Sequence, residues 1–133
     1  MDQHVDAVND MQTWVEGRMI VRSARGPWHV RLTEQAVDAM LGLHDFDFNQ
    51  PWVLLVEVLD SARCSREAIL RMRSDLGMDM MRSRKATAWV FGADVEGAQW
   101  MEAVLRPLYD QVGPVAFFQD SDQARQWLRA HLQ

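Results

Sequence analysis

The last third of the chain repeats one pattern, in which a short apolar run leads into a helix that begins beside an acidic residue. The first run covers residues 86–91 and the second covers residues 114–118. Asp94 follows the first run and Asp120 follows the second, each where an N-cap is expected. Short apolar runs that alternate with helices are typical of parallel strands joined by crossover helices. The repeat therefore predicts an α/β fold and locates one edge of its sheet, but it specifies no reaction.

The preceding residues predict the rest of the same sheet. Residues 14–25 contain two extended segments joined by a tight turn at Gly17, which indicates a β-hairpin. An amphipathic helix is expected over residues 32–43, with Thr33 as its N-cap. Residues 52–59 form a continuous apolar run rich in valine, which favours a central strand covered on both faces. A hairpin followed by three strand–helix alternations predicts a mixed sheet with about four helices.

Two further helices are expected in the second half of the chain. A long one is predicted from Ser65 to Arg84, with Glu67 in its first turn and apolar residues at Ile69, Met72, Leu76 and Met80. Its methionines suit either core packing or a groove that binds a partner. The terminal helix follows Asp120, with Gln123 as the second residue of a capping box. Its inward-facing residues are expected to be Ala124, Trp127, Leu128 and either His131 or Leu132.

Length and composition favour one globular domain. The chain has 133 residues, of which 48% are hydrophobic, enough for one core. Cys64 is the sole cysteine, so no internal disulfide can form and a reducing compartment is favoured. The sequence shows neither the pattern of a signal peptide nor an apolar run of about eighteen residues. We therefore expect a single cytoplasmic domain over residues 1–133, with residues 1–11 poorly ordered or peripheral.

The charge distribution restricts the class of partner. The net charge of −5 argues against nucleic acid, because phosphate binding requires a basic surface. The segment from Arg63 to Lys85 is an exception, with seven basic and three acidic residues. This local excess fits a solvated helix face, and it also fits a surface for an acidic partner that includes Arg71 and Arg73.

Four segments share their order and character with one bacterial family. They are the hairpin ending in Arg25-Gly-Pro-Trp28, the strand before the serine-capped helix, Ala86-Thr-Ala-Trp-Val-Phe-Gly92, and Phe117-Phe-Gln-Asp-Ser-Asp-Gln-Ala-Arg-Gln-Trp-Leu128. Together they resemble the SpoIIAA-like family of STAS and SEC14-type bacterial domains. The resemblance runs from about Trp14 to Leu132. It implies a small STAS-like α/β fold in which a mixed sheet consists of an N-terminal hairpin plus three parallel strands.

The resemblance also implies two kinds of function. Anti-sigma-factor antagonists with STAS domains are phosphorylated on the serine of an Asp-Ser-x-Gly segment, and this releases a partner. Here Asp60-Ser61-Ala62 is followed by Arg63 instead of glycine, so the switch motif is incomplete. The SEC14 side of the resemblance implies an apolar or lipid-like ligand. The expected lining of such a carrier is Met72, Met80, Trp52 and Trp89.

The predicted sheet also indicates where a site lies. Ligands of open α/β sheets bind beyond the carboxyl ends of the parallel strands. The residues expected at that edge are Trp28, His29, Asp60, Ser61, Gly92, Asp94, Asp120 and Ser121. The acidic ones suit helix capping or a magnesium ion, and Ser61 or Ser65 suits phosphate at a helix N-terminus. The four histidines lack metal-ligand spacing, and no nucleophile has a base beside it in sequence.

We therefore expect a non-catalytic STAS-like regulatory module that binds a partner protein or a small ligand without a cofactor or metal. The expected contact residues are Trp28, His29, Asp60, Ser61, Ser65, Asp94, Asp120, Arg71 and Arg73. One alternative is a SEC14-like carrier of an apolar or lipid-like ligand. Another is an anti-sigma-factor-antagonist-type phosphoswitch at Ser61 or Ser65. A homodimer is compatible with these expectations, whereas nucleic acid and stable membrane insertion are not.

Overall fold

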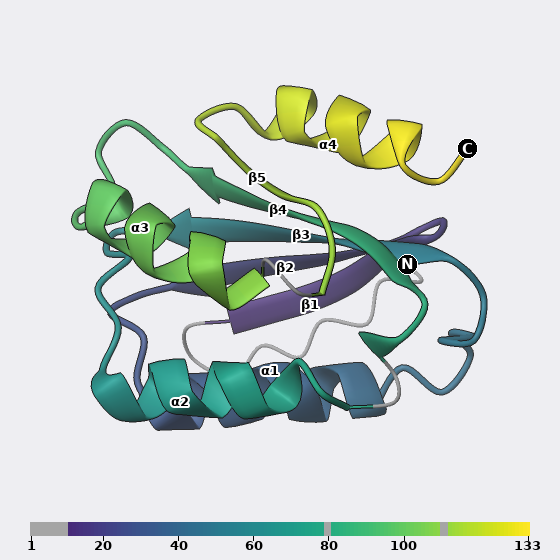
Figure 1. The fold of residues 1–133 in the computed structure, drawn as a ribbon, viewed down its shortest axis with the longest axis horizontal. Helices are drawn as coiled ribbons and strands as arrows, with labels where there is room; N and C mark the ends of the chain where they lie inside the picture. Colours follow the sequence, from purple (N-terminus) through teal and green to yellow (C-terminus); the bar gives the residue numbers. More distant parts are fainter. Residues whose placement is uncertain (1–10, 79–80, 110–111) are drawn as a thin grey trace.

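The computed structural model of the chain describes residues 11–78, 81–109 and 112–133. The elements run β1 (Met11–Glu16), β2 (Met19–Arg25), α1 (Val30–Leu41), β3 (Trp52–Leu59), α2 (Arg66–Asp75), β4 (Arg84–Phe91), α3 (Ala98–Tyr109), β5 (Val115–Phe118) and α4 (Ser121–Ala130). The strands form one sheet in numerical order, antiparallel between β1 and β2 and parallel elsewhere. This confirms the predicted α/β fold, with its N-terminal hairpin and parallel strands (Figure 1).

The central strand β3 is covered on both faces, as its apolar run predicts. Residues 52–56 are at most 2% exposed. Leu54 and Val56 belong to a core shared with α1, α2 and α3, whereas Val53 and Leu55 belong to a core shared with α4. Successive side chains of a strand point to opposite faces, so one uninterrupted apolar run supports both layers.

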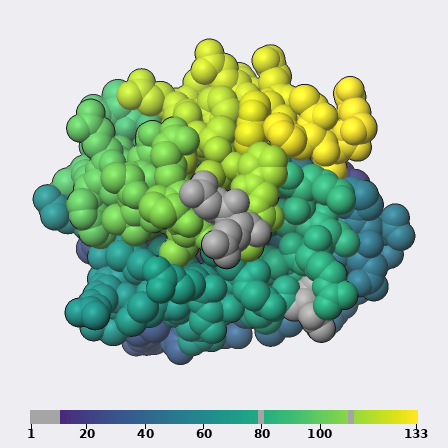
Figure 2. Space-filling model, viewed as in Figure 1, coloured from purple at the N-terminus to yellow at the C-terminus, as the bar shows by residue number. Residues whose placement is uncertain are grey.

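The helices form two unequal layers around this sheet. Helix α4 lies on one face, and α1 and α2 lie together beneath the other (Figure 1). Buried residues of α3 belong to the same core as those of α1. On the surface, α3 and α4 (green and yellow) cover the upper part of the view and α2 (teal) covers the lower part (Figure 2). The sheet is thus enclosed between helices, while its strand ends remain at the sides.

The hairpin turn and the N-cap of the terminal helix have the predicted local structure. Gly17 has a φ of 62°, which a two-residue hairpin turn requires and which glycine adopts without strain. Asp120 is the N-cap of α4, and its carboxylate accepts a hydrogen bond from the backbone N–H of Asp122 at 3.0 Å. Ala124 and Leu128 are fully buried, as expected for the inward face.

The start of α1 differs from the prediction. The helix begins at Val30, and His29 is its N-cap, with the ring Nδ1 accepting from the backbone N–H of Leu32 at 3.3 Å. Thr33 is therefore inside the helix, where its hydroxyl donates to the carbonyl of Val30 at 2.6 Å. Threonine forms such bonds within a helix as readily as it caps one, so sequence position alone does not separate the two roles.

Helix α2 is shorter than predicted. It begins after Ser65 as expected, but it ends at Asp75 instead of continuing to Arg84. Gly77 follows closely and has low helix propensity, so the apolar spacing alone does not extend the helix. Met72 and Leu76 pack against the core as half-buried side chains. Met80, also assigned to this stripe, lies outside the described residues.

A register shift between β3 and β4 turns Arg84 inward. Trp52 pairs with Arg84, but Val53 pairs with Ala86, which leaves Lys85 as an extra residue. Such a bulge changes the face on which a side chain lies. The guanidinium of Arg84 consequently lies 5.9 Å from the ring centroid of Trp52, and the residue is 8% exposed.

The structure bears only in part on two expectations from the sequence, the peripheral N-terminal segment and the absence of a membrane-spanning helix. The expectation of a peripheral segment over residues 1–11 falls on residues outside the described part, apart from Met11. Met11 begins β1 and is 2% exposed. No helix among the described residues is long and apolar enough to cross a membrane.

Helix α4 is joined to the hairpin by a two-pronged ion pair. The guanidinium of Arg125 donates to both carboxylate oxygens of Glu16, at 3.0 and 2.9 Å. This bond from Arg125 lowers the pKa of Glu16 below its ordinary value of 4.5, although burial opposes the shift. The pair connects the C-terminal helix with the first strand, across 109 positions of sequence.

We expect replacement of Glu16 with glutamine to lower the free energy of unfolding at neutral pH by about 1 kcal/mol. Because the folded-state pKa of Glu16 is depressed, its contribution is complete above the unfolded value and is lost as the pH falls through the folded value. Urea unfolding of wild type and E16Q from about pH 7 to about pH 3 should therefore give a difference that shrinks below about pH 4.5.

The matched control is E102Q, which removes an exposed i,i+4 pair with Arg106 inside one helix. This substitution should change stability less than E16Q. A constant difference between wild type and E16Q over the whole pH range would show that the pair does not contribute through ionisation.

Candidate functional site

The loops that follow β2, β3 and β4 are held together by backbone hydrogen bonds. The N–H of Trp28 donates to the carbonyl of Arg63 at 2.7 Å, and the N–H of Ser65 donates to the carbonyl of Trp28 at 2.9 Å. The N–H of Ala62 donates to the carbonyl of Glu96 at 2.6 Å. This edge of the sheet, predicted to carry a site, is therefore a rigid platform.

Gly26 is required where the first two of these loops cross. A Cβ built on Gly26 would lie 1.7 Å from the carbonyl oxygen of Ser61. The N–H of Gly26 donates to the carbonyl of Leu59 at 3.0 Å, which holds the loop close to the end of β3. No side chain fits in that space, so the absence of a Cβ permits the close approach.

Several of the predicted contact residues have structural roles at this edge. His29, Ser65 and Asp120 are the N-caps of α1, α2 and α4. The Ser65 hydroxyl accepts from the backbone N–H of Ala68 at 3.1 Å. Trp28 is 3% exposed and packs against Trp89 with ring centroids 5.9 Å apart, so it lies in the core instead of on the surface.

The acidic residues of the edge do not converge on one point. Asp60 has a φ of 66° and forms an ion pair with Arg25. Asp94 was expected to cap α3, but that helix begins at Ala98, so Asp94 lies in a turn ahead of it. Across residues 11–78, 81–109 and 112–133, no group of three His, Cys, Asp or Glu residues is placed to hold a metal ion.

The two nucleophile candidates of the edge are held in unreactive surroundings. Ser61 is 6% exposed, and its hydroxyl accepts from the backbone N–H of Arg63 at 3.2 Å. Burial raises the pKa of the Cys64 thiol to about 11. At neutral pH the thiol is therefore protonated, and only the thiolate is an effective nucleophile.

The two arginines predicted to form a surface for an acidic partner, Arg71 and Arg73, have different surroundings. Arg71 donates to Glu34 of α1 and to Asp75 of its own helix, each at 3.1 Å. The bond with Asp75, and then its charge, raise the pKa of Arg71. Arg71 thus links the two helices, while Arg73 is exposed.

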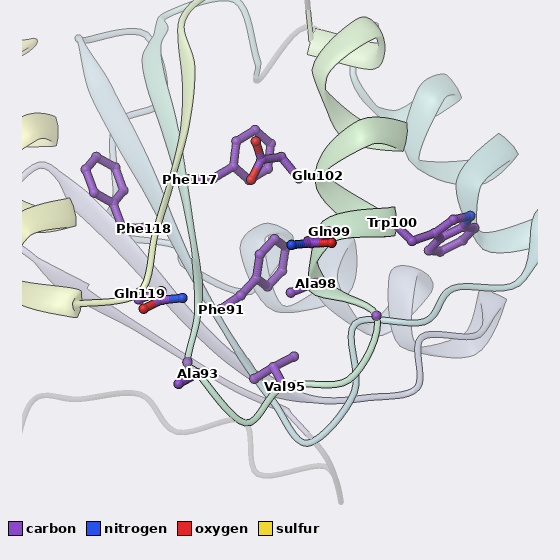
Figure 3. A pocket seen from close by; sticks show the side chains of 12 residues that line it. Phe91, Ala93, Val95, Ala98, Gln99, Trp100, Glu102, Phe117, Phe118 and Gln119 are labelled. Carbon is purple, nitrogen blue, oxygen red and sulfur yellow. The ribbon is translucent and has the colours of Figure 1, made fainter.

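A groove of about 660 Å³ lies at the carboxyl ends of β4 and β5, beside the first turns of α3. The Phe91 and Phe117 rings stack at 6.0 Å within it. Figure 3 shows the amides of Gln99 and Gln119 pointing toward Phe91, whereas the indole of Trp100 points away. The groove thus combines aromatic rings with two amides that both donate and accept hydrogen bonds, and with the carboxylate of Glu102.

A second hollow of about 400 Å³ adjoins this groove. The two share Gly92, Ala93 and Val95 as lining residues. The second hollow also reaches Asp60 and Asp94, so these two predicted residues do lie at the margin of one continuous depression. The sequence predicted the edge, but not Gln99 or Gln119, because a glutamine in a helix or after a strand has no distinctive pattern.

A separate, small cavity of about 50 Å³ lies between the sheet and the α1–α2 pair. Its lining includes Arg22 and Arg84, which are 7% and 8% exposed. The alternation of side chains along β2 indicates that Arg22 points inward, because Arg22 lies between the inward-facing Ile20 and Ala24. No such pattern indicates that Arg84 points inward, because the bulge that turns Arg84 cannot be read from the sequence.

No protein-family model matches this sequence, and no curated protein matches it. Inference about function therefore rests on the groove and the cavity themselves. The groove lies where α/β sheets bind ligands, and the cavity is small and lined by charged side chains.

We expect Gly26→Ala to lower the free energy of unfolding by roughly 3 kcal/mol or to prevent folding, because the new methyl group collides with the Ser61 carbonyl. Gly92→Ala is the control, since its nearest atom would be Val95 Cγ2 at 4.0 Å. Urea unfolding of both variants measures the difference. Equal stability of the two variants would contradict the close crossing of the loops.

Cys64 should react with a thiol-specific disulfide reagent roughly 100-fold more slowly than an ordinary cysteine at neutral pH. The change from a pKa of 9.0 to about 11 reduces the thiolate fraction by that factor. The urea-unfolded chain is the control for the same residue. A folded rate equal to the unfolded rate would contradict the burial of this thiol.

Proposed function

We propose that this protein is a non-catalytic, STAS-like binding module whose ligand site is the groove between α3 and the ends of β4 and β5. The observation that carries the proposal is the composition of the groove, which is lined by aromatic rings and by the polar side chains of Gln99, Glu102 and Gln119. A volume of about 660 Å³ falls within the usual range of ligand sites.

The chemistry of the groove favours a peptide segment as its ligand. A glutamine amide has the same donor and acceptor groups as a peptide bond, so two of them can pair with an extended main chain. Phe117 stacks on the buried Phe91 and has the guanidinium of Arg106 4.9 Å from its ring centroid. It is half-buried, so part of its ring is left for a side chain of that segment. The groove also adjoins β5, which is the last strand of the sheet and pairs with β4 on one side. Among residues 11–78, 81–109 and 112–133, β5 pairs with no other strand, and a strand edge of this kind is a common place for peptide addition.

The surroundings of the nucleophile candidates support a binding role over a chemical one. Burial raises the pKa of Cys64 to about 11, so its reactive thiolate is scarcer at neutral pH than that of an ordinary cysteine. The hydroxyl of Ser61 is buried and engaged with the backbone. The same burial argues against the phosphoswitch at Ser61, because a kinase needs access to the hydroxyl. Ser65 is more accessible, but its hydroxyl caps α2.

Among the residues that the structure describes, those expected to line a lipid carrier do not surround a cavity of lipid size. Trp52 is fully buried, and the cavity that Met72 and Trp89 line has a volume of only about 50 Å³. This volume is less than that of two water molecules at about 30 Å³ each, so it does not accommodate a lipid. We place the module in the bacterial cytoplasm, because its single cysteine favours a reducing compartment.

The proposal is tested by selecting ligands and mapping them. A displayed peptide library and a set of small amides are screened against the purified chain, and binders are measured with wild type, Q99A and Q119A. Loss of one amide should weaken binding about fivefold to tenfold. Q12A is the matched control, since Gln12 is an exposed glutamine on β1, outside the groove.

Peptides that lose affinity in Q99A and Q119A but not in Q12A would support the peptide site. Small amides that show this pattern while peptides do not would keep the groove and change the ligand class. Binders with equal affinity for all variants would overturn the proposal. Native mass spectrometry of the same sample reports whether a second copy of the chain is itself the partner.

A further inference from the structure

We propose that the small cavity beneath the sheet binds the carboxylate group of a small organic acid, with Arg22 and Arg84 as its positive partners. The cavity lies under the sheet beside α1 and α2, away from the strand-end groove, and the two sites have no lining residue in common. The assignment is therefore independent of the proposed function.

Arg22 is a buried cation whose hydrogen bonding is incomplete. Its side chain projects from β2 into the core on the α1 side of the sheet, where one Nη donates to the carbonyl of Ala36 at 3.3 Å. Its Nε has no hydrogen-bond partner. Burial lowers the pKa of Arg22 to about 10, which still leaves the group charged at neutral pH. A buried charge that is only partly compensated is costly, so this position favours an anion.

Arg84 adds a second positive charge to the same cavity. Its guanidinium lies 5.3 Å from the ring centroid of Tyr109, and burial lowers its pKa. The charge of Arg84 also lowers the pKa of Arg22, which shows that the two cations are close enough to repel. An anion between them converts this repulsion into two favourable interactions.

The acidic residue of the lining does not neutralise both arginines. Asp75 lines the cavity and raises the pKa of Arg22 through its charge. However, Asp75 accepts a hydrogen bond from Arg71 at 3.1 Å and so is already shared with a third cation. Arg22, Arg84 and Asp75 together leave one uncompensated positive charge, which matches a monoanion.

Neutral donors complete the site. Trp28 and Trp89 both line the cavity, and the indole N–H of each is buried without a hydrogen-bond partner. Buried N–H groups are rarely left unpaired, so their presence around one small space indicates an acceptor. A water molecule can accept such bonds, but it cannot compensate the charge of the arginines.

Size selects the class of anion. At about 30 Å³ per water molecule, the cavity of about 50 Å³ holds a group of about two oxygen atoms. A carboxylate fits this limit, and its paired oxygens suit the forked donors of a guanidinium. A phosphate group, with four oxygens, exceeds it. Met40 and Met72 in the lining are flexible side chains that can adjust to a short carbon chain beyond the carboxylate.

The first test uses the indole N–H signals of the ¹⁵N-labelled wild-type chain, which has six tryptophans. Sodium formate is titrated against sodium chloride at equal ionic strength, and W28F and W89F assign the two signals. We expect these two to move saturably with formate and less with chloride. Trp100, which is 45% exposed, is the internal control and should stay in place.

Octanoate distinguishes the two sources of a carboxylate. Tighter binding of octanoate than of formate would support the carboxylate end of an acyl chain, and tighter binding of formate would support a free small acid. Unmoved signals of Trp28 and Trp89, or equal drift of all six signals, would overturn the proposal and leave water as the partner of these donors. An equal response to chloride would overturn the assignment to a carboxylate.

The second test measures anion-dependent stability. At a formate concentration of 100 times the dissociation constant, the melting temperature of wild type should rise by roughly 10 °C. R22M replaces the buried cation with an apolar side chain of similar length and should abolish this rise. R73M removes an exposed arginine from α2 and should retain it. An equal rise in wild type and R22M would overturn the role of Arg22.

Discussion

The complete burial of β3 determines how the rest of the molecule is arranged. A strand that is apolar on both faces must be covered twice, so helices are needed above and below the sheet. The α4 side meets this need with one helix, which the Arg125–Glu16 pair joins to the hairpin. The other side requires α1, α2 and α3, whose packing surrounds the small charged cavity. The ends of the parallel strands remain uncovered at one edge, and there the groove lies.

Local sequence patterns were sufficient to predict the strands and two of the helix N-caps, Ser65 and Asp120. The hairpin, β3 and the start of α4 follow from alternation, an apolar run and a capping residue, which act over a few neighbouring positions. The starts of α1 and α3 and the end of α2 did not follow, because several nearby residues can cap or end a helix equally well. Thr33 and Asp94 have the side chain of an N-cap, yet tertiary packing places the helix start elsewhere.

The candidate sites were predictable only as an edge of the sheet. Loop residues chosen from sequence turned out to hold the loops to one another, as Ser65 does by capping α2 and Trp28 by packing on Trp89. The groove depends on α3 meeting β5, and the cavity depends on the bulge at Lys85. Both are contacts between distant segments, which the periodicity of one segment does not encode.

The partly or fully buried arginines of this protein differ in the groups that surround their positive charge. Arg125 is enclosed by acceptors, with Glu16 in a two-pronged pair, Glu57 at 3.9 Å and the hydroxyl of Ser121 in contact. Arg22 and Arg84 are more deeply buried, and their neighbours are aromatic rings, a backbone carbonyl, the hydroxyl of Tyr109, the charge of Asp75 and each other. Arg125 is thus paired with carboxylates in direct contact, whereas the two buried arginines share one carboxylate that also accepts from Arg71, and a ligand that supplies the missing negative charge explains this difference.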